Sequence, residues 1–197
     1  MLNVLWCLII SFITTYISMP VIIHIAEVKK LFDIPDNRKV HSAPIPALGG
    51  VGIFGGFMFA CLLCISFDST DGFQFYLGAA IVLFFIGLKD DLLVISPSKK
   101  FMGQLLAAFL LVYPGKLQIS NLHGLFGIQQ LSYYPAFILS MLAVLIIVNA
   151  FNLIDGLDGL AGTLGIISCA LMGMYFINNH IYNYAILAFA MSGSIVA

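Results

Sequence analysis

The sequence predicts an all-α, polytopic integral membrane protein with about seven transmembrane helices and its N-terminus outside. Hydrophobic residues make up 61% of the 197 residues and charged residues make up 9%, and the mean hydropathy is +1.08. Soluble domains carry about 25% charged residues, so this chain cannot cover a water-facing surface. The formal net charge of −1 also excludes a polybasic nucleic-acid-binding protein.

Charged residues divide the chain into apolar segments, and crossing a bilayer takes about 20 such residues. Residues 101–113 are short for a span, and the alternating pattern within residues 114–133 predicts a short hairpin or a re-entrant piece. We expect all spans to form one membrane domain over residues 1–197. The seven predicted spans are residues 2–24, 47–67, 73–88, 101–113, 134–151, 160–177 and 184–197.

The basic residues predict the orientation of these spans, because Lys and Arg concentrate in cytoplasmic loops. Polar loops 27–46 and 89–100 contain seven of the eight basic residues. Two spans separate these loops, so they lie on one side, which is then the cytoplasmic side. The same parity places Lys116 outside and a third polar loop, residues 152–159, in the cytoplasm.

Four aspartates follow the ends of spans on this cytoplasmic side, where ionisable residues are functional candidates. They are Asp90, Asp91, Asp155 and Asp158. Four carboxylates with few local bases repel one another unless a cation lies among them, and oxygen ligands suit Mg²⁺, with Mn²⁺ as the alternative. Nearby lysines could offset the repulsion between the first two aspartates: Lys89, Lys99 and Lys100.

Residues 149–161 carry the most informative motif, NAFNLIDGLDGLA. Asn149, Asn152, Asp155 and Asp158 recur every three residues, which places neighbours on one face of a helix. We predict that Asn152, Asp155 and Asp158 point into one pocket. The two asparagines are candidates for binding substrate, and the two aspartates for binding both substrate and metal.

The basic loop is the third candidate site. Arg38, Lys39 and His41 could hold the phosphates of a nucleotide or of an anionic lipid. Positive charge that determines topology explains the same residues almost as well.

Two further patterns predict ordinary membrane helices. Cys61 and Cys64 form a C-x-x-C pair without the second Cys or His pair that a zinc site requires. Residues 50–55 match G-x-G-x-x-G but follow a proline-rich loop in place of a strand, whereas Gly52 and Gly56 form the G-x-x-x-G spacing of closely packed helices.

With three motifs in order, the chain resembles the polyprenyl-phosphate N-acetylhexosamine-1-phosphate transferases. The motifs are RKVHSAPIPALGG at 38–50, GLKDDL at 87–92 and NAFNLIDGLDGLA at 149–161. The form of the first motif suggests the branch that uses donors like UDP-N-acetylglucosamine, and not the branch that uses muramoyl-pentapeptide.

The resemblance implies a magnesium-dependent reaction that starts cell-envelope polysaccharide synthesis. A membrane polyprenyl phosphate attacks the β-phosphate of a UDP-sugar, which gives a polyprenyl-diphospho-sugar and UMP. By position, it implies that Asp90 and Asp91 are catalytic or metal-binding acids, and that Asn152, Asp155 and Asp158 line the nucleotide and metal site. We expect a multi-pass protein of the bacterial inner membrane with its active site on the cytoplasmic face, and a homodimer as the candidate oligomer.

The resemblance extends along the whole chain but covers only the first part of the family pattern. A later Gly-Asp-containing motif and a His-containing loop have no counterpart here, so we expect either a fragment of a longer protein or an inactive truncated homologue. The non-enzyme alternative is an ion-coupled transporter, which predicts acids near the bilayer midplane within internal repeats. The CDP-alcohol phosphotransferases are an alternative class of enzyme. Their D-G-x-x-A-R pattern is missing from this chain.

Overall fold

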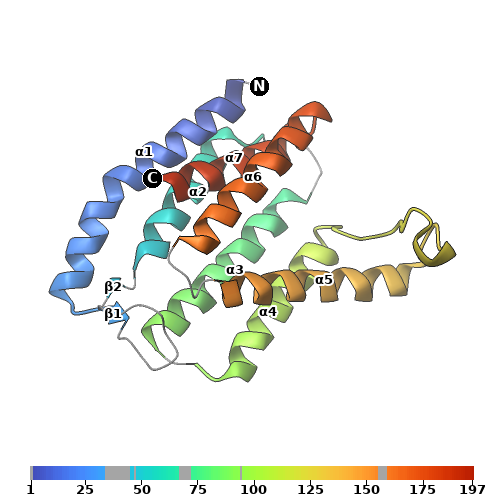
Figure 1. The fold of residues 1–197 in the computed structure, drawn as a ribbon, viewed down its shortest axis with the longest axis horizontal. Helices are drawn as coiled ribbons and strands as arrows, with labels where there is room; N and C mark the ends of the chain where they lie inside the picture. Colours follow the sequence, from blue (N-terminus) through green and yellow to red (C-terminus); the bar gives the residue numbers. More distant parts are fainter. Residues whose placement is uncertain (1, 34–44, 47, 67–71, 94, 155–158) are drawn as a thin grey trace. The chain divides into compact units, whose positions relative to one another are not determined.

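The computed structural model describes residues 2–33, 45–46, 48–66, 72–93, 95–154 and 159–197. Helices make up most of this part of the chain (Figure 1), so the predicted all-α class is confirmed for it. The helices are α1 (Leu2–Val28), α2 (Gly49–Cys64), α3 (Phe73–Leu92), α4 (Pro97–Val112), η1 (Leu125–Gly127), α5 (Tyr133–Ile154), α6 (Leu160–Asn178) and α7 (Tyr182–Val196). The two-residue strands β1 (Phe32–Asp33) and β2 (Ile45–Pro46) pair in antiparallel orientation.

The α-helices follow the predicted spans, but the predicted polar loop 89–100 is wrong at both ends. Helix α3 continues through Lys89 to Leu92, and α4 begins at Pro97. Charged residues end an apolar segment without ending a helix, because lysine is a good helix former and aspartate costs a helix only about 0.7 kcal/mol relative to alanine. Proline is favoured at the first helical position, so Ser96-Pro97 is the sequence signal for the start of α4.

Among the described residues, three helices are long and apolar enough to cross a membrane: α1, α5 and α6. Helices α2 and α7 are apolar but shorter, with 16 and 15 residues. These helices support a membrane location for the chain. The predicted number of seven spans and the outside N-terminus stay predictions.

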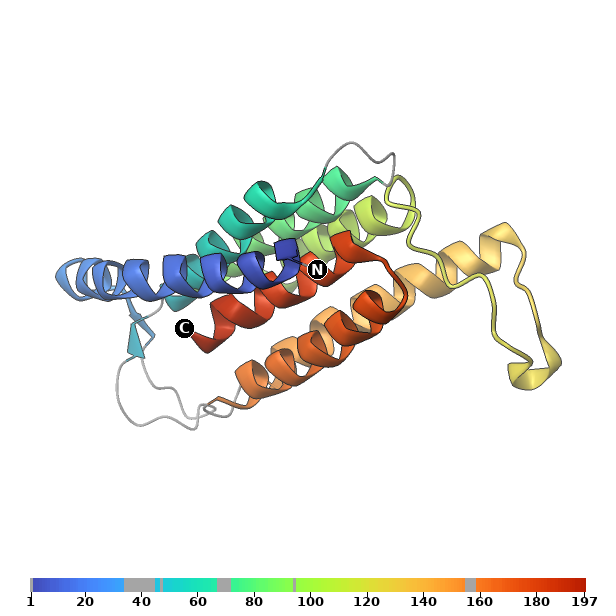
Figure 2. The ribbon, with the colours of Figure 1, turned by 90° about the horizontal axis from the view of Figure 1, so that it is seen from above.

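The chain divides into two compact units, one formed by residues 1–67 and 154–197 and the other by residues 68–153. The predicted single membrane domain stays a prediction. In the first unit, α7 packs against α1, α2 and α6, and Figure 2 shows it between α1 and α6. The buried residues of α7 are Ala185, Ile186, Ala190, Ser192, Gly193 and Ser194.

Small residues allow α1 to approach α2 and α7 closely. A Cβ atom on Gly56 would lie 2.8 Å from the Ser11 carbonyl oxygen, and one on Gly193 would lie 2.5 Å from the Leu8 carbonyl oxygen. The Thr15 hydroxyl donates a hydrogen bond of 3.3 Å to the Gly52 carbonyl oxygen. The prediction that the glycines at 52 and 56 serve helix packing is therefore confirmed.

In the second unit, α3 and α4 pack side by side and run antiparallel (Figure 1). The Tyr76 hydroxyl near the start of α3 donates a hydrogen bond of 3.1 Å to the Gly115 carbonyl oxygen, just after α4. This bond joins the ends of α3 and α4 that lie farthest from Asp90 and Lys100.

A hairpin separates α4 from α5, as the alternating pattern predicts. Asn121 and Gln130 form an antiparallel bridge. Before this bridge, the Ile119 amide donates a hydrogen bond of 2.8 Å to the Ser140 hydroxyl of α5, and Ser140 is 3% exposed. The buried Ser140 side chain thus links the start of the hairpin to α5 by a hydrogen bond.

Replacing Gly56 by valine should separate α1 from α2, because the new side chain would overlap Thr15 and the backbone of Ser11. We expect a loss of about 1–3 kcal/mol of stability, as for other overpacked cores. Thermal unfolding of the purified protein in detergent measures the loss. Gly55→Val is the matched control, because no atom lies within 4 Å of a Cβ at that position. Equal melting temperatures for the two variants would contradict the close packing.

Candidate functional site

The structure describes four of the nine predicted site residues, all in the second unit. Asp90 and Asp91 occupy the last turn of α3, and Asn149 and Asn152 occupy the last turns of α5. The other five lie outside the described residues: Arg38, Lys39, His41, Asp155 and Asp158.

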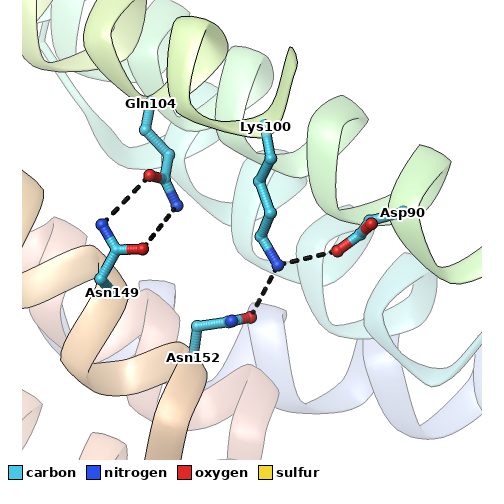
Figure 3. Close-up of polar contacts among 5 residues, drawn as sticks. All are labelled: Asp90, Lys100, Gln104, Asn149 and Asn152. Atoms are coloured by element: carbon cyan, nitrogen blue, oxygen red, sulfur yellow. Dashed lines mark hydrogen bonds and ion pairs between the residues drawn. The ribbon is translucent and has the colours of Figure 1, made fainter. Parts of the chain in front are cut away.

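Lys100 is the centre of the described site. Its ammonium nitrogen lies 2.7 Å from Asp90 Oδ2 and donates a second hydrogen bond, of 3.2 Å, to Asn152 Oδ1. Figure 3 shows this nitrogen between side chains that come from α3 and α5. One ammonium group on α4 therefore bridges a carboxylate and an amide oxygen from two other helices.

The local sequence explains why these groups meet. Asp90 is close to the end of α3, only a short connection follows, and Lys100 lies in the first turn of α4. Antiparallel packing then brings the two side chains to the same end of the helix pair. Of the three lysines expected to offset the acidic pair, Lys100 forms an ion pair with Asp90. About a quarter of each side chain is exposed, 26% for Lys100 and 28% for Asp90.

A second polar contact lies one turn away along both helices. Asn149 donates a hydrogen bond of 3.1 Å to Gln104 Oε1, and Gln104 donates one of 3.4 Å to Asn149 Oδ1 (Figure 3). Gln104 is 4% exposed. Asn149 and Asn152 lie on one face of α5, as their three-residue spacing predicts, and there they contact Gln104 and Lys100 of α4. The predicted role of both asparagines in binding substrate stays a prediction.

Asp91 differs from Asp90 in its surroundings. Its side chain is exposed, and successive residues of an α-helix are rotated by about 100° around the helix axis. The two adjacent carboxylates therefore leave α3 in different directions. Their assignments as catalytic and metal-binding residues stay predictions.

The described residues supply oxygen ligands that suit a hard cation. Asp90 Oδ2 and Asn152 Oδ1 both lie within hydrogen-bonding distance of one cationic nitrogen, and carboxylate and amide oxygens are ligands that Mg²⁺ accepts. Within the described ranges, no group of three or more His, Cys, Asp or Glu side chains could hold a metal ion. The predicted magnesium ligands Asp155 and Asp158 lie outside those ranges.

Gln104 is the residue that the sequence reasoning missed. It belongs to no motif, and its neighbours in α4 are apolar, including the buried Ala107 and Ala108. The available signal was its chemistry, because an amide within an apolar helix requires a hydrogen-bond partner. Its position four residues after Lys100 puts both side chains on one face of α4.

The bridge predicts a measurable coupling between Asp90 and Lys100. Lys100→Ala should lower the stability of the protein by about 1 kcal/mol, because it leaves a partly buried carboxylate without its cation. Adding Asp90→Asn should restore part of this loss. Thermal unfolding of the single and double variants measures the coupling, with Lys99→Ala as the control in the same turn. Additive losses would show that the two groups do not interact.

Comparison with known proteins identifies the family to which this chain is similar. The sequence profile described as Glycosyl transferase family 4 matches residues 73–197, which include every residue of the described site. Undecaprenyl-phosphate alpha-N-acetylglucosaminyl 1-phosphate transferase of Escherichia coli (strain K12) is 33% identical over 177 residues, covering 87% of this chain and 47% of that protein.

Two other relatives have similar sequence identities to this chain. The protein of the same name from Yersinia pestis is 30% identical over 167 residues, covering 84% of this chain and 45% of its own length. A probable undecaprenyl-phosphate N-acetylglucosaminyl 1-phosphate transferase of Bacillus subtilis (strain 168) is 33% identical over 115 residues, covering 58% and 32%. The chain spans about half the length of the curated relatives it matches. The profile matches well over half of this chain, which therefore belongs to Glycosyl transferase family 4.

Proposed function

We propose that this chain takes part in transferring a sugar-1-phosphate, of the N-acetylhexosamine type, from a UDP-sugar to a membrane polyprenyl phosphate, with release of UMP. The observation that carries the proposal is the Lys100 ammonium bridging Asp90 and Asn152 within the region matched by the family profile. The names of the relatives supply the acceptor and the type of sugar.

The reaction suits a site at a membrane boundary. The donor is water-soluble, whereas the tail of the acceptor requires lipid. Asp90 and Asn152 lie in the last turns of helices that are apolar along most of their length, where both substrates could meet. We extend the proposal to seven spans, an outside N-terminus and a site on the cytoplasmic face of the bacterial inner membrane.

The described side chains suit phosphate chemistry through charge and orientation. A phosphate monoester is largely ionised near pH 7, since its second pKa is about 6, so a general base has little to remove. We assign to Asp90 the orientation of the attacking phosphate oxygen. Lys100 presents a cation beside it, and ammonium groups form strong hydrogen bonds with phosphate oxygens. Asn152 holds that cation from the opposite side.

The remaining predicted residues complete the proposed site. Asp90, Asp91, Asp155 and Asp158 would hold Mg²⁺, which when bound neutralises charge on the transferring phosphoryl group. The basic loop would bind the donor phosphates through Arg38, Lys39 and His41. A homodimer stays a prediction.

Replacing the acids tests the proposed activity. In membranes from cells that express the natural gene, Asp90→Asn, Asp91→Asn and Asp155→Asn should each lower transfer by orders of magnitude, because each removes a carboxylate that would hold Mg²⁺ at the reacting phosphates. The assay supplies radiolabelled UDP-N-acetylglucosamine, polyprenyl phosphate and Mg²⁺, and measures lipid-linked sugar and UMP. Glu27→Gln, at the end of α1, is the matched acid-to-amide control. Near-normal turnover in all three variants would refute the catalytic assignment, and a wild-type protein without turnover would favour an inactive homologue.

The two ends of α5 test the proposed orientation. Phe126 in the hairpin is 89% exposed and Leu153 is 81% exposed, so a single cysteine at either position should react with a maleimide. With the four native cysteines replaced, a membrane-impermeant maleimide should label Phe126→Cys in intact spheroplasts and Leu153→Cys only after the membrane is opened. Labelling of Leu153→Cys from outside would contradict a cytoplasmic site.

A further inference from the structure

Gln104 and Asn149 form an amide pair that joins a buried side chain of α4 to an exposed residue of α5. Gln104 is 4% exposed, and both side chains donate to and accept from each other, at 3.1 Å and 3.4 Å. Asn149 also donates a hydrogen bond of 2.8 Å to the Leu145 carbonyl oxygen of its own helix. This additional bond restrains the rotamer of Asn149, so the amide pair has a defined geometry.

The amide pair is in register with the Lys100 bridge. Gln104 follows Lys100 by four residues on α4, and Asn149 precedes Asn152 by three residues on α5. Both spacings place side chains on one face of a helix. The two helices are therefore joined by two successive polar contacts, the bridge at the helix ends and the amide pair one turn further in (Figure 3).

These two contacts differ in what can replace them. The bridge is partly exposed, with 26% of the Lys100 side chain accessible, so an entering ligand or water could take the place of a partner. In the amide pair, Gln104 is buried, and its neighbours on α4 include the buried Ala107 and Ala108, so this amide finds no substitute when it loses its partner. Rotation of α5 against α4 would therefore break the amide pair without compensation.

We infer that the amide pair is a positioning device that sets the rotation of α5 against α4, so that Asn152 is presented to Lys100 and Asp90. This inference rests on the proposed function, because the groups that it positions belong to that site. It assigns Gln104 a role in the reaction without contact to substrate, and it gives Asn149 a positioning role in place of the substrate contact predicted from the sequence.

Kinetics of the full-length protein tests this role. Gln104→Ala and Asn149→Ala should each lower kcat by about 10- to 100-fold, the loss that a small misplacement of reacting groups produces. The double variant Gln104→Asn/Asn149→Gln exchanges the two amides, and it should recover most of the activity because the summed length of the two side chains is unchanged. Gln74→Ala is the matched control, since Gln74 is exposed in the first turn of α3, about 24 Å along the helix from Asp90.

Combination with Lys100→Ala separates positioning from general stabilisation. If the amide pair acts through Lys100 and Asn152, Gln104→Ala should cost less than about 3-fold when Lys100 is already absent, because residues that act as a unit are not additive. The full 10- to 100-fold loss in that background, or normal turnover of Gln104→Ala alone, would overturn the inference. If Gln104→Ala does not assemble in the membrane, Gln104→Asn replaces it, because it keeps the amide but shortens its reach by one methylene.

A distance measurement decides the inference without any activity. Spin labels at the exposed Met102 of α4 and Leu153 of α5 should give a narrow distance distribution in the wild type, with the native cysteines replaced. The distribution should broaden in Gln104→Ala and become narrow again in the exchanged variant. An unchanged distribution in Gln104→Ala would refute positioning. Absence of transfer by the wild-type protein, with this broadening still present, would refute only the proposed function.

Discussion

The Lys100 ammonium joins side chains from three helices, and the polar residues of the second unit are arranged around it. A charge or an amide that is buried or partly buried gains stability from a partner, because burial removes water that would otherwise hydrogen-bond to it. Asp90 and Asn152 satisfy Lys100, and Asn149 satisfies Gln104. The position of α5 against α4 follows from this requirement more than from shape, since most of the described surface of α5 is exposed.

Each of the two units is stabilised internally by a different kind of contact. In the first, residues without bulky side chains allow the backbones of α1, α2 and α7 to approach, as at Gly56 and Gly193. Dispersion forces between close backbones stabilise such packing in membranes, where apolar side chains gain little by leaving lipid. In the second unit, polar side chains on facing helices supply the specific contacts. A binding site requires polar side chains of this kind, because the side chains of glycine and alanine have no group that forms hydrogen bonds with a substrate.

Much of this organisation could be predicted from the sequence. Apolar runs interrupted by charges located the helices, and the three-residue spacing of Asn149 and Asn152 placed both on one face. The predicted loop 89–100 was wrong because charged residues mark the end of an apolar segment and not the end of a helix. The backbone hydrogen bonds of α3 extend to Leu92. Gln104 could not be paired with Asn149 in advance, because these residues lie 45 positions apart and their contact depends on how α4 and α5 are rotated.

Asp90 and Lys100 each occupy the end of a helix that disfavours their charge. An acid in the last turn of α3 faces the partial negative charge of the helix C-terminus, and a base in the first turn of α4 faces partial positive charge. The charge of each side chain is thus disfavoured by its own helix and stabilised by the other side chain. Exchanging the two residue types would favour both helices, so the observed arrangement departs from the best local stability, as functional sites commonly do.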